Sequence, residues 1–171
     1  HKELAKDESF KVKVYPAFRP DKAINVDWDS YVPYINKLSE VVGYPITNLY
    51  ELEKALHERI EFFHEANCRV SDHALDVVVY EKASFDEVNE ITIKALKGEK
   101  LTASEVAKYR GHIIVFLGRE YHRLGWVQQY HIKALRNNSS RMMRLVGPDT
   151  GFDCINDGNI APSLSRILDA L

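Results

Sequence analysis

The sequence predicts an α/β fold in which short parallel strands alternate with helices. Three segments have the character of strands, and they lie near residues 12–18, 69–74 and 126–133. The chain between them is long enough to form helices, and strands joined by such crossovers pair in parallel. An open doubly wound sheet and an arc of a β/α barrel both agree with this order. In either fold, functional side chains collect where the strands end.

The first part of the chain predicts one strand and two helices. VKVYPAFRP, residues 12–20, alternates valine with lysine and then meets prolines, as a strand that enters a loop does. Residues 29–42 predict a helix. In the next helix, Asn48 is placed as the N-cap and Glu51 is placed to reach back. Its apolar residues recur every three or four positions, at Leu49, Leu52, Leu56, Ile60 and Phe63.

A helical insertion is predicted over residues 84–125, after the second strand. Two helices within it each begin with a hydroxyl residue that is followed three positions later by glutamate. That is the spacing of a capping box, and it occurs at Ser84 with Glu87 and at Thr102 with Glu105. The second of these helices carries a wide apolar stripe. It is expected to end just before Gly125.

The third strand, VQQYHIKAL, is followed by residues 137–162, which are rich in Asn, Ser, Gly, Asp and Pro and predict a loop. A final helix follows this loop. The chain stops inside that apolar-periodic helix, and it starts in what resembles the polar tail of another helix. We therefore expect residues 1–171 to be one α/β segment of something longer.

The composition is that of a soluble globular protein, with 45% hydrophobic and 28% charged residues. A net charge of −2 gives no electrostatic reason to expect nucleic acid or membrane partners, and it is compatible with a homo-oligomer. No run approaches the roughly 18 apolar residues of a membrane span, and no signal peptide is recognised, so a cytoplasmic location is the default expectation. Cys68 and Cys154 lack metal-ligand spacing and are expected to be reduced thiols, with a disulfide as the less favoured alternative.

Polar side chains near the first strand include Arg19 and Asp21. The planar guanidinium of arginine matches a carboxylate through two parallel hydrogen bonds, which suggests an acid-binding role for Arg19. The simpler alternative is that Arg19 only pairs with Asp21. The sequence leaves both open, and the simpler one is favoured on the residues alone.

The ends of the other two predicted strands are also polar. The motif VSDHALD places His73 between Asp72 and Asp76, where it can be a general base, a metal ligand or a structural histidine beside a helix cap. The third strand ends in His131, followed by Arg136. His131 can equally be a core histidine that is bonded to a backbone carbonyl.

The remaining histidines and a search for common catalytic motifs give no further candidate site. Four histidines fall on predicted helices and are expected to be solvated or packed: His57, His64, His112 and His122. The chain shows no HxH pair, CxxC pair, HExxH, phosphate-binding GxxxxGK[ST] or GxSxG motif. These absences exclude the common zinc protease, P-loop and serine hydrolase classes.

Three long motifs give a family resemblance. YPAFRPDKA, CRVSDHALD and GWVQQYHIKALRNNSSRMMRLVGPDTGFDCIND resemble segments of the bacterial uronate (glucuronate) isomerases, and the resemblance extends over essentially the whole chain. It implies a central part of a (β/α)8 TIM-like barrel of the metal-dependent hydrolase type, in the amidohydrolase superfamily, with a large helical content.

The implied reaction is aldose–ketose isomerisation in hexuronate catabolism. It interconverts D-glucuronate with D-fructuronate, and D-galacturonate with D-tagaturonate, by proton transfer between C2 and C1 through an enediol. A divalent metal, with zinc as the expected ion, would act as a Lewis acid at the reacting oxygens. The alternatives are a non-catalytic fragment of such an enzyme and a metal-dependent hydrolase of the same superfamily.

The resemblance also assigns expected roles. Arg19, in the matching FRPDK motif, is expected to hold the substrate carboxylate. His131 is expected to be catalytic, as a ligand of substrate or metal, and Asp72, His73 and Arg136 are expected to bind substrate. The family's own metal ligands, an HxH pair and a late aspartate, have no match in this chain. The main metal ligands are therefore expected outside it.

Overall fold

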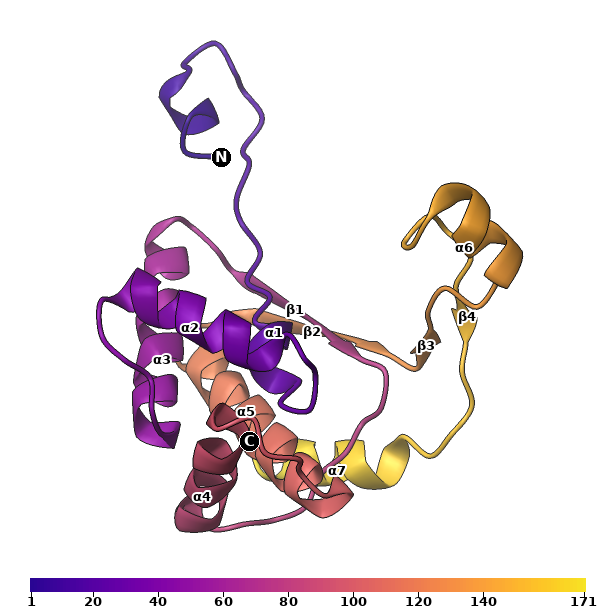
Figure 1. Cartoon of the computed structure of the whole chain (residues 1–171). Coiled ribbons are helices and arrows are strands. Elements are labelled where there is room, and N and C mark those ends of the chain that lie inside the picture. The colour runs from indigo at the N-terminus through magenta and orange to yellow at the C-terminus, as the bar shows by residue number, and fades with distance from the viewer.

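A two-stranded parallel sheet with helices packed against it forms the centre of the computed structural model, which describes residues 1–171 (Figure 1). The elements in chain order are a short 3-10 helix Leu4–Lys6, α1 Asp21–Ile24, α2 Tyr31–Val42, α3 Leu49–Glu65, β1 Val70–Leu75, α4 Phe85–Leu96, α5 Ala103–Arg123, β2 Val127–Ile132, β3 Ala134–Leu135, α6 Ser140–Val146, β4 Cys154–Ile155 and α7 Ala161–Asp169. The chain is therefore an α/β structure in which helices predominate. None of these helices is both long enough and apolar enough to cross a membrane.

Strands β1 and β2 pair in parallel, with Val70 opposite Val127 and Leu75 opposite Ile132. Helices α4 and α5 occupy the chain between them, as the crossover argument predicts. The two faces of the pair differ. Alternate residues of β1 are buried on the side of α5, whereas the residues between them are only partly buried. The strand β2 is more exposed along its whole length.

The prediction of a strand over residues 12–18 is wrong in extent. Only Phe18 pairs with β1, through a bridge to Ser71, and most of the segment before it is exposed and extended without a partner. Pro16 and Pro20 flank the bridge, and proline lacks the N–H that a continuing ladder requires. The valine–lysine alternation that suggested a strand therefore lies outside the sheet.

The prediction of a loop over residues 137–162 is also wrong in part, because α6 and β4 lie within it. Ser139 caps α6 by accepting a hydrogen bond from the backbone N–H of Met142 at 3.3 Å. Strand β4 pairs antiparallel with β3. Figure 1 shows β3, α6 and β4 as an arm that extends from the helices. Cys154, in this arm, and the buried Cys68 are both free thiols.

An aromatic cluster holds the start of the sheet against the helices. The Phe18 ring meets Phe63 of α3 edge-on at 5.0 Å, and it meets Tyr121 of α5 and Trp126 at 6.2 Å each. Tyr121 also stacks on Trp126 at 5.5 Å. Aromatic pairs at these separations add to the stabilisation from buried area. The cluster therefore fixes Phe18, and with it the next residue of the chain, relative to β1.

The helix starts largely follow the predicted capping pattern. Capping boxes are present at Ser84 with Glu87 and at Thr102 with Glu105. Asn48 caps α3 as expected, but the Glu51 carboxylate reaches back to the N–H and hydroxyl of Thr47 rather than to Asn48. Local sequence thus determines where these helices begin.

Acid should weaken the α5 cap. The hydrogen bond from Lys94, together with those from the N–H and hydroxyl of Thr102, lowers the pKa of Glu105 from 4.5 to about 2. Because the folded pKa lies below the unfolded one, this stabilisation is complete above pH 4.5 and is lost as the pH falls towards 2. We expect the free energy of unfolding to decrease over that range, and to decrease less steeply in Glu105→Gln. Urea denaturation at a series of pH values measures this, and equal slopes would contradict it.

A buried tyrosine pair connects α5 to the first helices. The Tyr31 and Tyr109 hydroxyls lie 2.8 Å apart, and the Tyr109 hydroxyl donates to the Ala23 carbonyl of α1 at 2.8 Å. Burial raises the pKa of Tyr31 to about 12 and that of Tyr109 well above 10, so both phenols are neutral at ordinary pH.

Tyr109→Phe should destabilise the fold by about 1–3 kcal/mol, because it leaves a buried hydroxyl and a buried carbonyl without partners. Urea denaturation of Tyr109→Phe tests this prediction. Tyr50→Phe, at a side chain that is 68% exposed, is the control and should change little. A Tyr109→Phe variant as stable as the control would show that the pair contributes nothing.

Candidate functional site

Arg19, Asp72 and His131 form a continuous chain of charged and polar contacts. Arg19 Nη1 donates to Asp72 Oδ2 at 3.0 Å, and His131 Nε2 lies 2.7 Å from Asp72 Oδ1. Arg19 Nε also donates to Asp21 Oδ2 at 2.9 Å. The alternative that Arg19 only pairs with Asp21 is therefore incomplete, because one guanidinium contacts both aspartates.

The sheet explains why these distant residues meet. Phe18 accepts a hydrogen bond from the N–H of Asp72 at 3.0 Å, which brings Arg19 beside a residue 53 positions away. In the parallel register His131 lies opposite Ala74, two residues beyond Asp72. Successive side chains of a strand point to opposite faces, so Asp72 and His131 lie on the same face. That face carries the more exposed side chains of both strands.

His73 lies on the opposite, covered face. Its side chain is only 1% exposed, its ring stacks on Tyr121 at 5.7 Å, and its Nδ1 is 3.3 Å from Asp21 Oδ1. The sequence suggested that His73 lines the same opening as Asp72. The structure instead separates the two residues, because neighbouring strand residues alternate between faces. His73 reaches the exposed chain only through Asp21.

Arg136 is held in a different place. Its Nη1 donates to Asp153 Oδ2 at 2.8 Å, and the same carboxylate accepts the N–H of Asn137 at 2.8 Å. Both interactions lie in the arm of β3, α6 and β4. The structure therefore brings together Arg19, Asp72 and His131, but it does not join Arg136 to them through any hydrogen bond or ion pair.

The surroundings of Arg19 and Asp21 favour the ionised form of each side chain. Burial alone would raise the pKa of Asp21, but hydrogen bonds from His73, the N–H of Ala74 and Arg19 lower it overall. The hydrogen bond to Asp21 raises the pKa of Arg19, with further contributions from the charges of both aspartates. Arg19 therefore stays cationic and Asp21 anionic across the neutral range. Arg19 is the cation of the network, and its side chain is 48% exposed, so part of the guanidinium is open to solvent.

The same residues fit a metal ion only in part. Asp72 and His131 offer a carboxylate oxygen and an imidazole nitrogen, which are the donor types that zinc accepts. Catalytic zinc sites have three protein ligands, and these are two. One oxygen of Asp72 is also paired with Arg19. The described residues therefore do not complete a metal site here.

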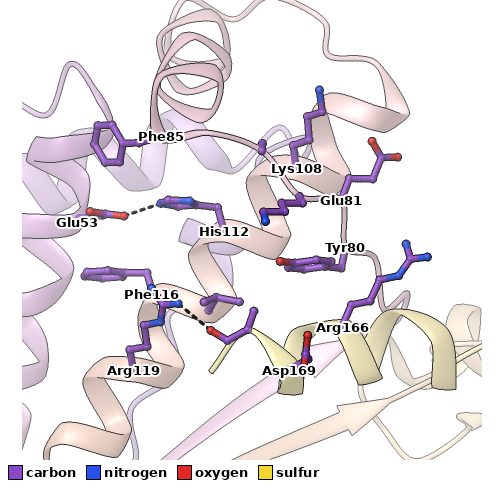
Figure 2. A pocket seen from close by; sticks show the side chains of 14 residues that line it. Glu53, Tyr80, Glu81, Phe85, Lys108, His112, Phe116, Arg119, Arg166 and Asp169 are labelled. Atoms are coloured by element: carbon purple, nitrogen blue, oxygen red, sulfur yellow. Dashed lines mark hydrogen bonds and ion pairs between the residues drawn. The ribbon is translucent and has the colours of Figure 1, made fainter.

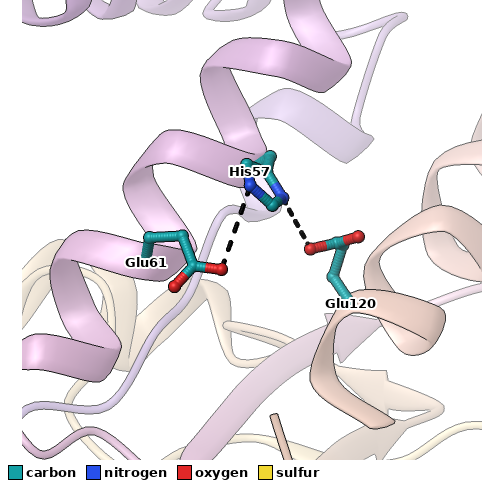
Figure 3. Close-up of side chains that lie close together, drawn as sticks. All are labelled: His57, Glu61 and Glu120. Carbon is teal, nitrogen blue, oxygen red and sulfur yellow. Dashed lines mark hydrogen bonds and ion pairs between the residues drawn. The ribbon is translucent and has the colours of Figure 1, made fainter. Parts of the chain in front are cut away.

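A second group of metal-ligand type lies on the helices. His57 and Glu61 of α3 and Glu120 of α5 bring their ligand atoms within 4.8 Å of one another (Figure 3). Both carboxylates already pair with Arg123, whose single positive charge offsets one of their two negative charges. Sequence reasoning missed this group. The four-residue spacing of His57 and Glu61 on one helix could have suggested a pair, but nothing local indicates Glu120.

A wide pocket of about 890 Å³ also lies on the helical side (Figure 2). Its walls come from α5, α7, the segment that leads into α4, and Glu53 of α3. Within it, His112 Nε2 lies 2.7 Å from Glu53 Oε1, and Arg119 donates to the Ala170 carbonyl at 2.8 Å. None of the site residues predicted from the sequence lines it. The pocket is therefore separate from the Arg19–Asp72–His131 chain.

Comparisons with known proteins match the whole chain. A family model described as glucuronate isomerase matches residues 1–171. A uronate isomerase from Caldicellulosiruptor saccharolyticus is 53% identical over 171 residues, and one from Clostridium acetobutylicum is 50% identical. Each match covers 100% of this chain but only 37% of the relative, so the chain spans little more than a third of their length.

Two solved structures of isomerases also superimpose on almost the whole chain. A uronate isomerase from Thermotoga maritima superimposes with a TM-score of 0.87 at 33% identity, covering 96% of this chain and 37% of the other. A glucuronate isomerase from Caulobacter crescentus gives a TM-score of 0.84 at 20% identity, covering 99% and 35%. The second likeness bears on the fold alone. All of these relatives are substantially longer than 171 residues.

Proposed function

The chain belongs to the glucuronate isomerase family, and from this premise we propose that it forms part of the active site of a uronate isomerase. The reaction we propose interconverts D-glucuronate with D-fructuronate, and D-galacturonate with D-tagaturonate. The observation that carries the proposal is the Arg19–Asp72–His131 chain on the exposed face of the sheet. It combines a group that binds carboxylates with groups that can move a proton.

In the proposed fold, β1 and β2 are neighbouring strands of a (β/α)8 barrel. Parallel strands are normally covered on both faces. The helices cover one face here, and the polar face with Asp72 and His131 would line the interior of a barrel completed by the rest of a longer protein. The parallel register of β1 and β2 supports this arrangement. Residues at the ends of barrel strands carry the chemistry in such folds.

Arg19 binds the substrate carboxylate in this proposal. Its Nε and Nη1 are used by the two aspartates, and its side chain remains 48% exposed, so it presents further donors to a ligand. A uronate differs from a neutral aldose by this carboxylate. A fixed cation at this point therefore both orients the sugar and selects an acid.

His131 moves the proton in this proposal. His131 Nε2 lies 2.7 Å from Asp72 Oδ1, and Nδ1 is the ring nitrogen that would accept a proton from C2 of the aldose and return it at C1. Asp72 thus lies between the imidazole of His131 and the guanidinium of Arg19. If a divalent metal is held here, Asp72 and His131 would supply two of its ligands, the metal would supply Lewis-acid chemistry at a substrate oxygen, and His131 would then be a ligand in place of the proton-transfer group.

Isomerisation of D-glucuronate to D-fructuronate tests the function. We expect turnover, with zinc added, by the full-length enzyme that contains this chain and none by the 171-residue chain alone, since the metal ligands present here are incomplete. Turnover by the 171-residue chain would show that these residues suffice to build the site. A full-length enzyme with no activity on either uronate would contradict the proposed function.

His131→Ala in the full-length enzyme should lower kcat strongly, because general acid–base groups contribute about 10²- to 10⁴-fold. Metal content, measured alongside activity, separates a proton-transfer role from a ligand role. His122→Ala, at an exposed histidine of α5, is the control. Unchanged activity and unchanged metal content in His131→Ala would exclude His131 from the site.

A further inference from the structure

Asp21 connects three parts of the chain through one carboxylate. It is the first residue of α1, and its side chain is only 15% exposed. Its Oδ2 accepts from Arg19 Nε at 2.9 Å and from the N–H of Ala74, in β1, at 3.0 Å. Its Oδ1 lies 3.3 Å from Nδ1 of the buried His73. The Asp21 carboxylate therefore contacts an arginine, a buried histidine and a backbone N–H of β1 at once.

We propose that Asp21 is a positioning residue that orients Arg19 for the substrate carboxylate, an inference that rests on the proposed function of Arg19. One oxygen of Asp21 holds both the Arg19 side chain and the β1 backbone. The guanidinium is therefore fixed relative to the strand that also carries Asp72. Asp72 takes the second contact, at Nη1.

Two contacts at different nitrogens fix the plane of a guanidinium, whereas one leaves it free to turn about that contact. Without Asp21, Arg19 would keep only its pair with Asp72, and its half-exposed side chain would sample other orientations. Oriented donors bind a carboxylate better because less side-chain freedom is lost on binding. The cation would still be present without Asp21, but its donors would not face the ligand consistently.

His73 contacts the Asp21 carboxylate at the oxygen that does not bind Arg19. It is buried on the covered face, where its ring stacks on Tyr121. Its contact with Oδ1 leaves Oδ2 directed at Arg19 and Ala74. Partners of this kind, one step behind the group that meets the ligand, commonly set its geometry. Tyr121 thus packs on His73, His73 contacts Asp21, and Asp21 accepts the hydrogen bond from Arg19.

The kinetic test is a double-mutant cycle in the full-length enzyme with D-glucuronate as substrate. We expect Asp21→Asn to raise KM about tenfold, the equivalent of one charge-assisted hydrogen bond, with a smaller change in kcat. In an Arg19→Met background, Asp21→Asn should have almost no further effect, because its action passes through Arg19. Effects that add independently of Arg19, or an unchanged KM in Asp21→Asn, would overturn the proposal.

A matched control is Asp27→Asn, which removes the surface carboxylate that pairs with Arg110 at 2.5 Å. It should leave KM unchanged. Asp21→Asn preserves the volume of the side chain. If it unfolds the protein, Asp21→Ser supplies the second variant, with a smaller oxygen acceptor and no charge for Arg19, and the same rise in KM is expected.

A second measurement needs no enzyme activity. In the full-length enzyme with ¹⁵N-labelled arginine, the Arg19 Nε–H signal in a ¹H–¹⁵N spectrum should exchange slowly with water, and it should exchange faster in Asp21→Asn but not in Asp27→Asn. Equal exchange in the wild-type protein and Asp21→Asn would overturn the positioning role even if uronate is the substrate. If the full-length enzyme has no uronate activity, the proposed function fails while this measurement still decides the role of Asp21.

Discussion

Arg19→Met in the full-length enzyme is expected to lower kcat/KM for D-glucuronate roughly 12- to 140-fold. Charge-assisted hydrogen bonds of the kind lost here contribute about 1.5–3 kcal/mol, and each 1.4 kcal/mol corresponds to about a tenfold change. The loss should appear mainly in KM, because the carboxylate is bound in both the ground state and the transition state. Steady-state kinetics with D-glucuronate and D-galacturonate measure it.

Two further variants make the result specific. Arg19→Lys keeps the charge but loses the planar fork that contacts Asp21 and Asp72 together, so an intermediate KM is expected. Arg123→Met removes another arginine that lies between two carboxylates, those of Glu61 and Glu120. It lies on the helices and should leave KM unchanged. Uronate binding and turnover that survive Arg19→Met would show that the carboxylate is held elsewhere.

The elements that the sequence predicts well are those fixed by near neighbours. Ser84 with Glu87 and Thr102 with Glu105 form their capping boxes from residues three positions apart, and both helices start where this spacing predicts. The segment around Phe18 is different. Its place beside β1 depends on a bridge to Ser71 and on packing against Phe63, Tyr121 and Trp126, none of which the local alternation encodes. Tertiary context decides strand pairing more than propensity does.

In the candidate site, too, contacts between near neighbours could be predicted, whereas contacts set by the sheet could not. Arg19 with Asp21 is a local pair, and the sequence suggested it directly. The contact of Arg19 with Asp72, and of Asp72 with His131, depends on strand register and was not predictable from the motifs alone. His73 was assigned to the same opening as Asp72, yet neighbouring strand residues face opposite ways. Arg136 follows His131 closely in sequence but lies in the arm, paired with Asp153.

Phe18→Ala is expected to produce the largest loss of stability, about 3–5 kcal/mol in the free energy of unfolding, because it removes a buried ring and leaves a cavity among its aromatic neighbours. The Phe18 side chain is 6% exposed and contacts three other rings. Urea denaturation measures the loss. Phe18→Leu keeps part of the volume and should lose less, and Tyr50→Ala, at an exposed ring, should change little.

Phe18→Ala should also affect the site, because Phe18 holds Arg19 to β1. Its N–H donates to the Val70 carbonyl at 3.1 Å and its carbonyl accepts from Asp72 at 3.0 Å. With the ring gone, the packing that presses this bridge onto the strand is lost, so the Arg19 Nε–H should exchange faster under conditions where the chain remains folded. A variant that is destabilised but retains wild-type exchange at Arg19 would show that the backbone bridge alone positions the arginine. The aromatic cluster would then stabilise the fold without orienting the site.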